Sequence, residues 1–192
     1  YDPAGRLTDR TQQNPGSGEY DIAYDPRGLP EQITTNDDAG TWTETRTYGP
    51  DTELASVTMD PPTEAAETTG LTWDPTTPLR QIVSIADTDL IYGRGRLGSE
   101  TEQHGVDLRD STISGSRAAG SVYDPWGQVQ GATANAPTSI ALGYRGELIL
   151  GEQINLRSRD YDSARGSFAN RDPLDGIVGT SGEANSYWYA FN

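Results

Sequence analysis

The residues of this chain best suited to chemistry are its single histidine, His104, and its many carboxylates. A histidine can serve as general base to a serine, but no Gly-x-Ser-x-Gly elbow accompanies it here. The chain has no cysteine, which excludes thiol catalysis, disulfides and Cys-ligated zinc. We therefore predict that His104 is an exposed loop residue rather than a member of a catalytic triad.

Two pairs of aspartates, Asp87/Asp89 and Asp160/Asp162, have the i, i+2 spacing found in calcium-binding loops. Neither pair has the remaining ligands or the glycine of an EF-hand, so a solvated strand or turn is the better interpretation. The segment Gly93–Gly98 has the spacing of a phosphate-binding glycine loop, but no helical pattern follows it. We expect no metal ion and no cofactor.

Charge narrows the classes of partner. The 192 residues include 29 acidic and 14 basic side chains, which give a formal net charge of −15 and a sequence pI near 4.2. Nucleic acids and anionic membrane surfaces attract clustered cations, so neither is an expected partner. No apolar run approaches the roughly 20 residues that span a bilayer, so no membrane insertion is expected. Because the chain opens with Tyr1 and shows no signal-peptide pattern, we expect it to be a piece of a longer protein.

Composition also indicates the fold class. Aliphatic residues are scarce, whereas the chain contains 10 Tyr and 4 Trp. Its 22 Gly and 12 Pro favour many turns over long helices. We predict an all-β fold that is thin, rich in turns and held together by aromatic side chains.

A repeat supplies the elements of that fold. The motif Tyr-Asp-Pro-x-Gly begins at Tyr1, Tyr24 and Tyr123, and degenerate copies begin at Tyr48 and Trp73. The aromatic residues that begin the first four copies, Tyr1, Tyr24, Tyr48 and Trp73, are separated by 23, 24 and 25 residues. Such regular steps predict one structural unit per repeat.

The chemistry of the repeat is that of a tight turn. In a type I turn, Asp at the first position accepts backbone N–H groups, Pro at the second has its φ preset, and Gly occupies the fourth. The predicted turn residues are Asp2, Gly5, Asp25, Gly28, Asp124 and Gly127. Each repeat then forms a β-hairpin whose Tyr or Trp ends the incoming strand, and we expect the aromatic rings of neighbouring hairpins to stack.

These repeats resemble the YD repeats of Rhs proteins, Tc-toxin C components and teneurins. The C-terminal part is similar, in order and spacing, to the Rhs-associated core. The segments that carry this similarity are Gly143–Glu147, Ile154–Asp162, Gly166–Phe168, Arg171–Leu174 and Asn185–Asn192.

The resemblance implies consecutive hairpins that form a curved strip, part of a hollow β-shell, at residues 1–140. Residues 141–192 would form the core, which curls inward. A wall one sheet thick fits the low aliphatic content. The implied function is a structural one: the shell of a secreted or cell-surface toxin holds and presents a C-terminal effector. The implied partners are the upstream repeats, the effector, and components of a secretion machinery or toxin complex.

The resemblance also implies chemistry, because the family core is often an aspartyl autoprotease. Asp172 would be one carboxylate of a catalytic pair, and Arg171 would influence the ionisation of its partner. The sequence stops at Asn192, before the family's cleavage segment, so we expect no turnover by this chain itself. The alternative for Asp172-Pro173 is a simple turn.

Two further alternatives stay open. A repetitive acidic β-protein also fits an extracellular adhesin or a fibre subunit that grows through open strand edges. Tyr187, Tyr189 and Phe191 have the period-2 spacing of one strand face, which predicts packing, although such rings also stack on sugars.

Overall fold

The computed structural model describes residues 1–10, 19–37, 40–76, 80–92, 96–115, 122–130, 140–151, 153–157, 159–171, 187 and 189. Within these residues the regular structure is strand, apart from one 3-10 turn, η1 (Tyr144–Gly146). The predicted all-β fold class is therefore confirmed.

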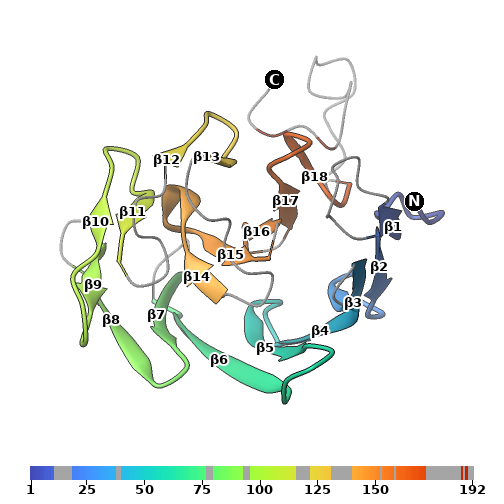
Figure 1. Cartoon of the computed structure of the whole chain (residues 1–192), viewed down its shortest axis with the longest axis horizontal. Coiled ribbons are helices and arrows are strands. Elements are labelled where there is room, and N and C mark those ends of the chain that lie inside the picture. The colour runs from blue at the N-terminus through green and yellow to red at the C-terminus, as the bar shows by residue number, and fades with distance from the viewer. Residues whose placement is uncertain are drawn as a thin grey trace.

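The largest sheet has nine strands, each paired antiparallel with the strand before it in sequence. Consecutive hairpins therefore build the whole sheet, as predicted, and Figure 1 shows it bent into an arc. Its strands are β1 (Asp9–Arg10), β2 (Glu19–Tyr24), β3 (Pro30–Asp37), β4 (Gly40–Tyr48), β5 (Leu54–Asp60), β6 (Glu67–Asp74), β7 (Gln81–Ile85), β8 (Thr88–Tyr92) and β9 (Arg96–Ser99).

The sequence of β6 shows why these segments form strands with one buried face. Thr69 and Leu71 are buried, whereas Thr68, Gly70 and Thr72 between and beside them are exposed. This alternation places one side of the pleat against the core and the other against solvent. Its β-branched threonines also suit a half-buried pleated surface.

The curvature of the sheet coincides with the repeat. Four hairpins shift register by one residue at the repeat's aromatic position, namely at Tyr24, Tyr48, Trp73 and Tyr92. In each case the returning strand carries one extra residue opposite the aromatic, which is a β-bulge. A bulge bends its strand and increases the local twist, so a bulge in every repeat curves the sheet regularly.

A second sheet of five strands lies inside this arc, as Figure 1 shows. It is an antiparallel meander of β14 (Ile140–Leu142), β15 (Leu148–Leu150), β16 (Gln153–Asn155), β17 (Asp160–Asp162) and β18 (Ser167–Phe168). Two short hairpins precede it, β10 (Gly105–Val106) with β11 (Thr112–Ser114), and β12 (Val122–Tyr123) with β13 (Val129–Gln130).

The two sheets share a hydrophobic core, which corrects the expectation of a wall one sheet thick. Leu54 and Val57 of β5 belong to the same buried cluster as Leu148 and Leu150 of β15. All four side chains are at most 2% exposed. Burying one such side chain contributes roughly 1.5–3 kcal/mol, so the concave face is stabilised by the second layer. The second sheet begins at Ile140, and the division into domains at residue 140 stays a prediction.

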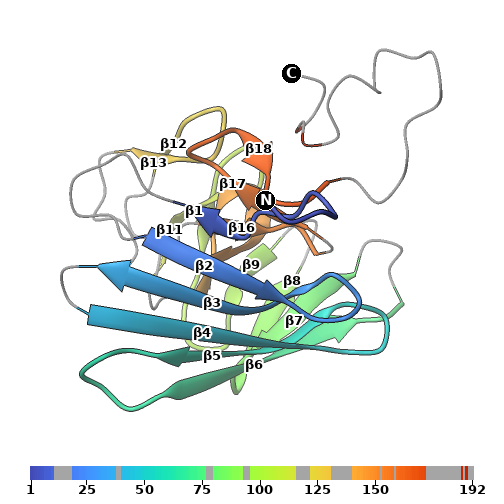
Figure 2. The same ribbon diagram turned by 90° about the vertical axis from the view of Figure 1, so that its right-hand side faces the viewer.

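The first and last described parts of the chain are joined. Arg6 forms an isolated antiparallel bridge with Asn170, and Leu7 N–H donates to the Ala169 carbonyl at 3.1 Å. Leu7 and Ala169 are also buried in one small cluster with Ile22 and Ile33. Figure 2 shows the N-terminal segment beside β17 and β18, so the inner sheet closes onto the start of the arc.

Candidate functional site

The repeat turns share one hydrogen-bonding pattern, in which a single carboxylate oxygen accepts two backbone N–H groups. Asp2 Oδ1 accepts from Ala4 (3.0 Å) and Arg6 (2.9 Å), Asp25 Oδ1 from Arg27 (2.9 Å) and Leu29 (2.9 Å), and Asp124 Oδ1 from Trp126 (2.8 Å) and Gln128 (2.9 Å). Gly5, Gly28 and Gly127 close these turns at φ values of 76°, 85° and 90°. Glycine adopts this left-handed region without the steric cost of a Cβ.

The folded state favours ionisation of two turn aspartates, Asp2 and Asp25. The Arg6 guanidinium, followed by the Arg6 backbone N–H, lowers the pKa of Asp2. Burial opposes ionisation of Asp25, but hydrogen bonds from the Leu29 backbone and from Arg27 lower its pKa overall. The carboxylates therefore act as charged acceptors that hold the turns.

A further turn of this kind was missed at the sequence level. Asp107 Oδ1 accepts from Arg109 N–H (2.8 Å) and Ser111 N–H (2.9 Å), and Asp110 N–H donates to the Asp107 carbonyl (3.1 Å). Asp110 takes the position of the glycine, with φ of 63°. This copy lacks the Tyr, Pro and Gly of the motif, and only Asp107 followed three positions later by Asp110, a residue type that tolerates the left-handed region, could have indicated it.

A hydrogen bond between neighbouring repeats recurs along the arc. Four repeat aromatics donate a side-chain hydrogen bond to a carbonyl of the preceding hairpin or turn, and we call these bonds the aromatic latches. They run from Tyr24 to Leu7 (2.7 Å), from Tyr48 to Pro30 (2.8 Å), from Trp73 to Leu54 (2.7 Å) and from Tyr92 to Ile82 (2.6 Å). In three of them the acceptor residue is the strand partner of the preceding repeat aromatic. In the first, the acceptor is Leu7, which follows the first repeat turn. We expected stacked rings, whereas the recurring contact is a hydrogen bond that fixes one hairpin to the next.

Arginines of the turns add to two of the latches. The Arg6 guanidinium lies 4.6 Å from the centre of the Tyr24 ring, and that of Arg27 lies 5.9 Å from the Tyr48 ring. Each is a cation–π contact between one repeat's turn and the next repeat's aromatic. In these two repeats, the motif therefore forms a turn and also supplies a contact to the aromatic residue of the following hairpin.

An ion pair buried between the two sheets links the arc to the inner sheet. Arg46 on β4 is 2% exposed and donates from Nη1 to Asp160 Oδ2 on β17 at 2.5 Å. The same guanidinium pairs with Glu44 and reaches Gln153 Oε1 at 3.3 Å. Asn155 donates to the other oxygen of Asp160 at 3.0 Å. Both charged partners are thus hydrogen-bonded, as burial requires.

These contacts correct the interpretation of Asp160/Asp162 as a solvated pair. Both residues lie in a strand but are only 2% and 1% exposed. Asp162 Oδ1 accepts from Ala164 N–H at 3.0 Å and Arg165 N–H at 3.2 Å. Asp87 and Asp89, by contrast, are exposed as expected. Among the described residues no group of three or more His, Asp and Glu is placed to hold a metal ion.

Of the two residues proposed for autoproteolysis, Arg171 lies where the first and last described parts of the chain meet. Arg171 is described and exposed, and a Cβ built on Gly5 would lie 3.8 Å from Arg171 Cβ. Tyr187 Oη donates to the Gly5 carbonyl at 2.6 Å, and Tyr1 packs edge-on against the Tyr187 ring. Asp172 lies outside the described residues, so the structure does not test its proposed role.

An aromatic cluster holds the end of the inner sheet. The ring of Tyr161 lies 4.5 Å from that of Tyr189 and 5.9 Å from that of Phe168. The Arg159 guanidinium lies 3.6 Å from the centre of the Phe168 ring. Tyr187 and Tyr189 lie in a turn and a bend rather than in the expected strand, and Phe191 is outside the described residues. Both tyrosines nevertheless pack against protein.

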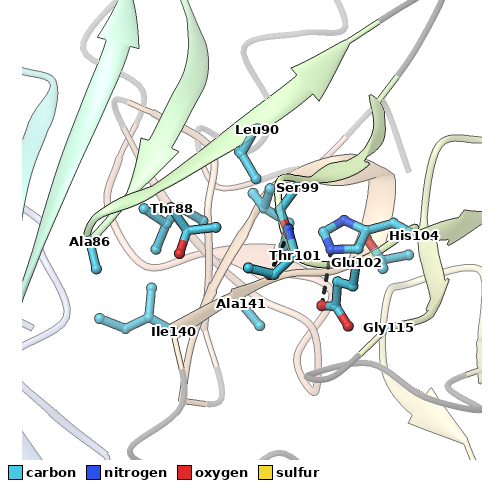
Figure 3. Close-up of a pocket in the computed structure, with 13 residues that line it drawn as sticks. Ala86, Thr88, Leu90, Ser99, Thr101, Glu102, His104, Gly115, Ile140 and Ala141 are labelled. Atoms are coloured by element: carbon cyan, nitrogen blue, oxygen red, sulfur yellow. Dashed lines mark hydrogen bonds and ion pairs between the residues drawn. The ribbon is translucent and has the colours of Figure 1, made fainter.

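His104 is not the exposed loop residue that we expected. Its side chain is 12% exposed, and Nε2 lies 3.2 Å from Glu102 Oε1. Figure 3 shows this pair at one end of a pocket, opposite Ala86 and Ile140. The pocket has a volume of about 190 Å³ and lies between the β7–β8 hairpin and β14. No serine or second carboxylate is hydrogen-bonded to His104 in the described part of the chain, so the pair alone supports no triad.

The described residues include no helix with the length and apolar character needed to cross a bilayer.

The glycine-rich segment Gly93–Gly98 is only partly described. Residues 93–95 lie outside the described residues, and Arg96 to Gly98 belong to β9.

Comparison with known proteins adds a likeness in fold. No model of a protein family matches the chain, and no curated protein matches it. Among solved structures it is similar to a chain in the crystal structure of TcdB2-TccC3-Cdc42, with a TM-score of 0.59 and 17% identity over 90% of this chain. A chain in the crystal structure of TcdB2-TccC3 without the hypervariable C-terminal region aligns over 100% of this chain at 12% identity and a TM-score of 0.35. This chain spans 10% and 16% of the lengths of those two chains. The first likeness shows that the fold is shared.

Proposed function

We propose that this chain is a wall segment of a secreted Rhs/YD-repeat toxin, and that the wall encapsulates and presents a C-terminal effector. The aromatic latches are the observation that carries this proposal. They join each hairpin to the one before it, at the position where a bulge bends the sheet. Units that repeat both a joint and a bend can be added in series to build a curved wall.

The shared fold supports the same proposal. The first similar structure contains the Tc-toxin components TcdB2 and TccC3, and it aligns with nearly the whole of this chain. The upstream repeats would extend the sheet from β1, the edge strand of the arc, because unpaired edge groups favour the addition of strands. The inner sheet would then close this end of the wall.

The test uses the parent protein, with its upstream repeats and its C-terminal effector. Electron microscopy is expected to show closed capsules, and the effector is expected to resist a protease that digests the isolated effector. Regular filaments would instead favour the adhesin or fibre subunit. An effector that is digested equally fast in both forms would contradict encapsulation.

Autoproteolysis by Asp172 in the intact precursor is a second proposal, favoured by where Arg171 lies. Arg171 follows the Arg6–Asn170 bridge and packs beside the first repeat turn, so the arginine of the proposed site is held close to the start of the chain. A precursor with Asp172→Asn is expected to stay uncut, whereas the matched variant Asp175→Asn is cut like the wild type. Cleavage of the Asp172→Asn precursor at the wild-type rate would exclude this role.

A further inference from the structure

Arg96 is a buried cation whose partners among the described residues do not balance its charge. It is 6% exposed and donates from Nη2 to the hydroxyl of Thr112. Its Nε has no hydrogen-bond partner within the described part of the chain, and no carboxylate there forms an ion pair with it. A buried cation without an ion-pair partner is unfavourable, and an anion at the site would offset that cost.

The Arg96 side chain lines a cavity of about 200 Å³ between the arc and the η1 turn. One water needs only roughly 10–15 Å³ of such volume, so the cavity has room for a small hydrated ion. Arg145 and Arg157 also line it, together with the carboxylates of Glu147 and Asp110. Arg157 Nη1 pairs with Glu147 Oε1 at 2.9 Å, and Asp110 lines the cavity without forming an ion pair with Arg96.

A glycine lines this cavity beside Arg96. Gly146 forms part of the wall with φ of 71°, and a Cβ there would lie 3.6 Å from Arg96 Nη1 and 3.3 Å from the Asp110 carbonyl. Burial lowers the pKa of Arg96, while Tyr92 and Asp110 oppose that shift. A guanidinium nevertheless keeps its proton at neutral pH and offers a planar set of donors that matches an oxyanion.

We propose that this cavity binds a small oxyanion, phosphate or carboxylate, through the guanidinium of Arg96. The net charge of −15 repels anions from the chain as a whole, so binding depends on this local group of arginines. The site is independent of the proposed encapsulating role, because it needs only residues of this chain.

The proposal is tested by thermal unfolding of the 192-residue chain with inorganic phosphate, against sodium chloride at equal ionic strength. Phosphate at ten times its Kd is expected to raise Tm by roughly 3–6 °C, with saturation. A parallel titration with acetate distinguishes a phosphate site from a carboxylate site, and saturation by either anion supports the proposal. A Tm that does not depend on either anion overturns it.

Two variants and a control locate the site. Arg96→Met is expected to weaken anion binding at least tenfold while its Tm without anion is maintained, because an unbalanced charge has been removed. Arg145→Gln, at an exposed residue of the cavity rim, is expected to weaken binding less. Arg109→Gln removes the same charge from an exposed turn and is expected to bind like the wild type. If Arg109→Gln and both cavity variants bound the anion equally well, the assignment of the anion site to this cavity would be overturned.

Discussion

Arg46 on β4 and Asp160 on β17 form an ion pair of 2.5 Å across 114 residues of sequence, with both side chains at most 2% exposed. This contact joins the outer arc to the inner sheet at a point where neither charge reaches water. Removing one member of such a pair leaves the other uncompensated, whereas replacing both with apolar residues is often tolerated.

Asp160→Asn is therefore expected to lower the free energy of unfolding by about 3–5 kcal/mol. The double variant Arg46→Met/Asp160→Leu is expected to recover much of that loss. Urea denaturation of the wild type, Arg46→Met, Asp160→Leu and the double variant gives the coupling energy. Simple additivity of the two single effects would show that the pair does not act as a unit.

Removal of one aromatic latch is expected to weaken the arc modestly. Burial raises the pKa of Tyr48, so its phenol stays protonated and donates to the Pro30 carbonyl throughout the neutral range. Tyr48→Phe deletes this bond and is expected to cost about 0.5–1.5 kcal/mol in urea denaturation. Tyr1→Phe, at a residue that is 57% exposed, serves as control and is expected to change stability little.

Three glycine substitutions separate backbone strain from crowding. Gly28→Ala places a Cβ at φ of 85° against only the end of Arg6, and is expected to cost about 1–2 kcal/mol. Gly127→Ala adds contacts of 2.8 Å with Tyr144 and 3.0 Å with Ile154, so its loss is expected to be larger by about 1–3 kcal/mol.

Gly70→Ala is the matched control for these two variants. Its Cβ would meet nothing within 4 Å, and it lies inside β6. It is expected to raise stability by roughly 0.5–1 kcal/mol, because alanine loses less backbone entropy than glycine. A Gly28→Ala variant as stable as Gly70→Ala would contradict the importance of the left-handed turn. Midpoints of thermal or urea unfolding measure all three.

The pH dependence of stability is expected to reveal the turn carboxylates. The pKa of Asp25 is lower in the folded chain than its ordinary value of 3.8. A lowered folded-state pKa contributes stability above the ordinary value, and this contribution is lost as pH falls through the folded-state value. The urea midpoint of the wild type is thus expected to fall below about pH 4, and Asp25→Asn is expected to show a smaller fall.

The exposed aspartate Asp87 supplies the comparison for that experiment. Asp87→Asn removes a carboxylate from the β7–β8 turn, where no described hydrogen bond depends on it. Its stability is expected to fall with acid as much as that of the wild type. If the stability of Asp25→Asn fell with acid as much as that of the wild type, the turn hydrogen bonds would not favour ionisation of Asp25.

The fold could be predicted from sequence where its cause is local. The Asp-Pro-x-Gly turns depend on residues at most four positions apart, and their spacing then sets the hairpins. The turn at Asp107 was missed because its hydrogen bonds need an aspartate but not the proline or glycine of the motif. The same turn can therefore form in sequences that do not match the repeat motif.

Features that depend on distant segments could not be predicted. Nothing near Asp160 or His104 in sequence indicates burial, because the layer that covers each comes from another part of the chain. The aromatic latches were expected as ring contacts because composition shows which rings are present, but not which carbonyls lie within reach of them. The family resemblance did imply a core that curls inward, but the buried hydrophobic cluster that this core shares with the arc joins distant segments and could not be predicted from either segment alone.

The hydrogen bond from Tyr187 to Gly5 spans 182 residues, and this separation affects folding during synthesis. A ribosome adds about 5–20 residues per second, so the first turn emerges roughly 9–36 seconds before its last partner exists. The concave face of the arc therefore stays exposed until the inner sheet has been synthesised. During this period Leu54 and Val57 of β5 are exposed, so a chaperone that shields apolar surface would be most useful.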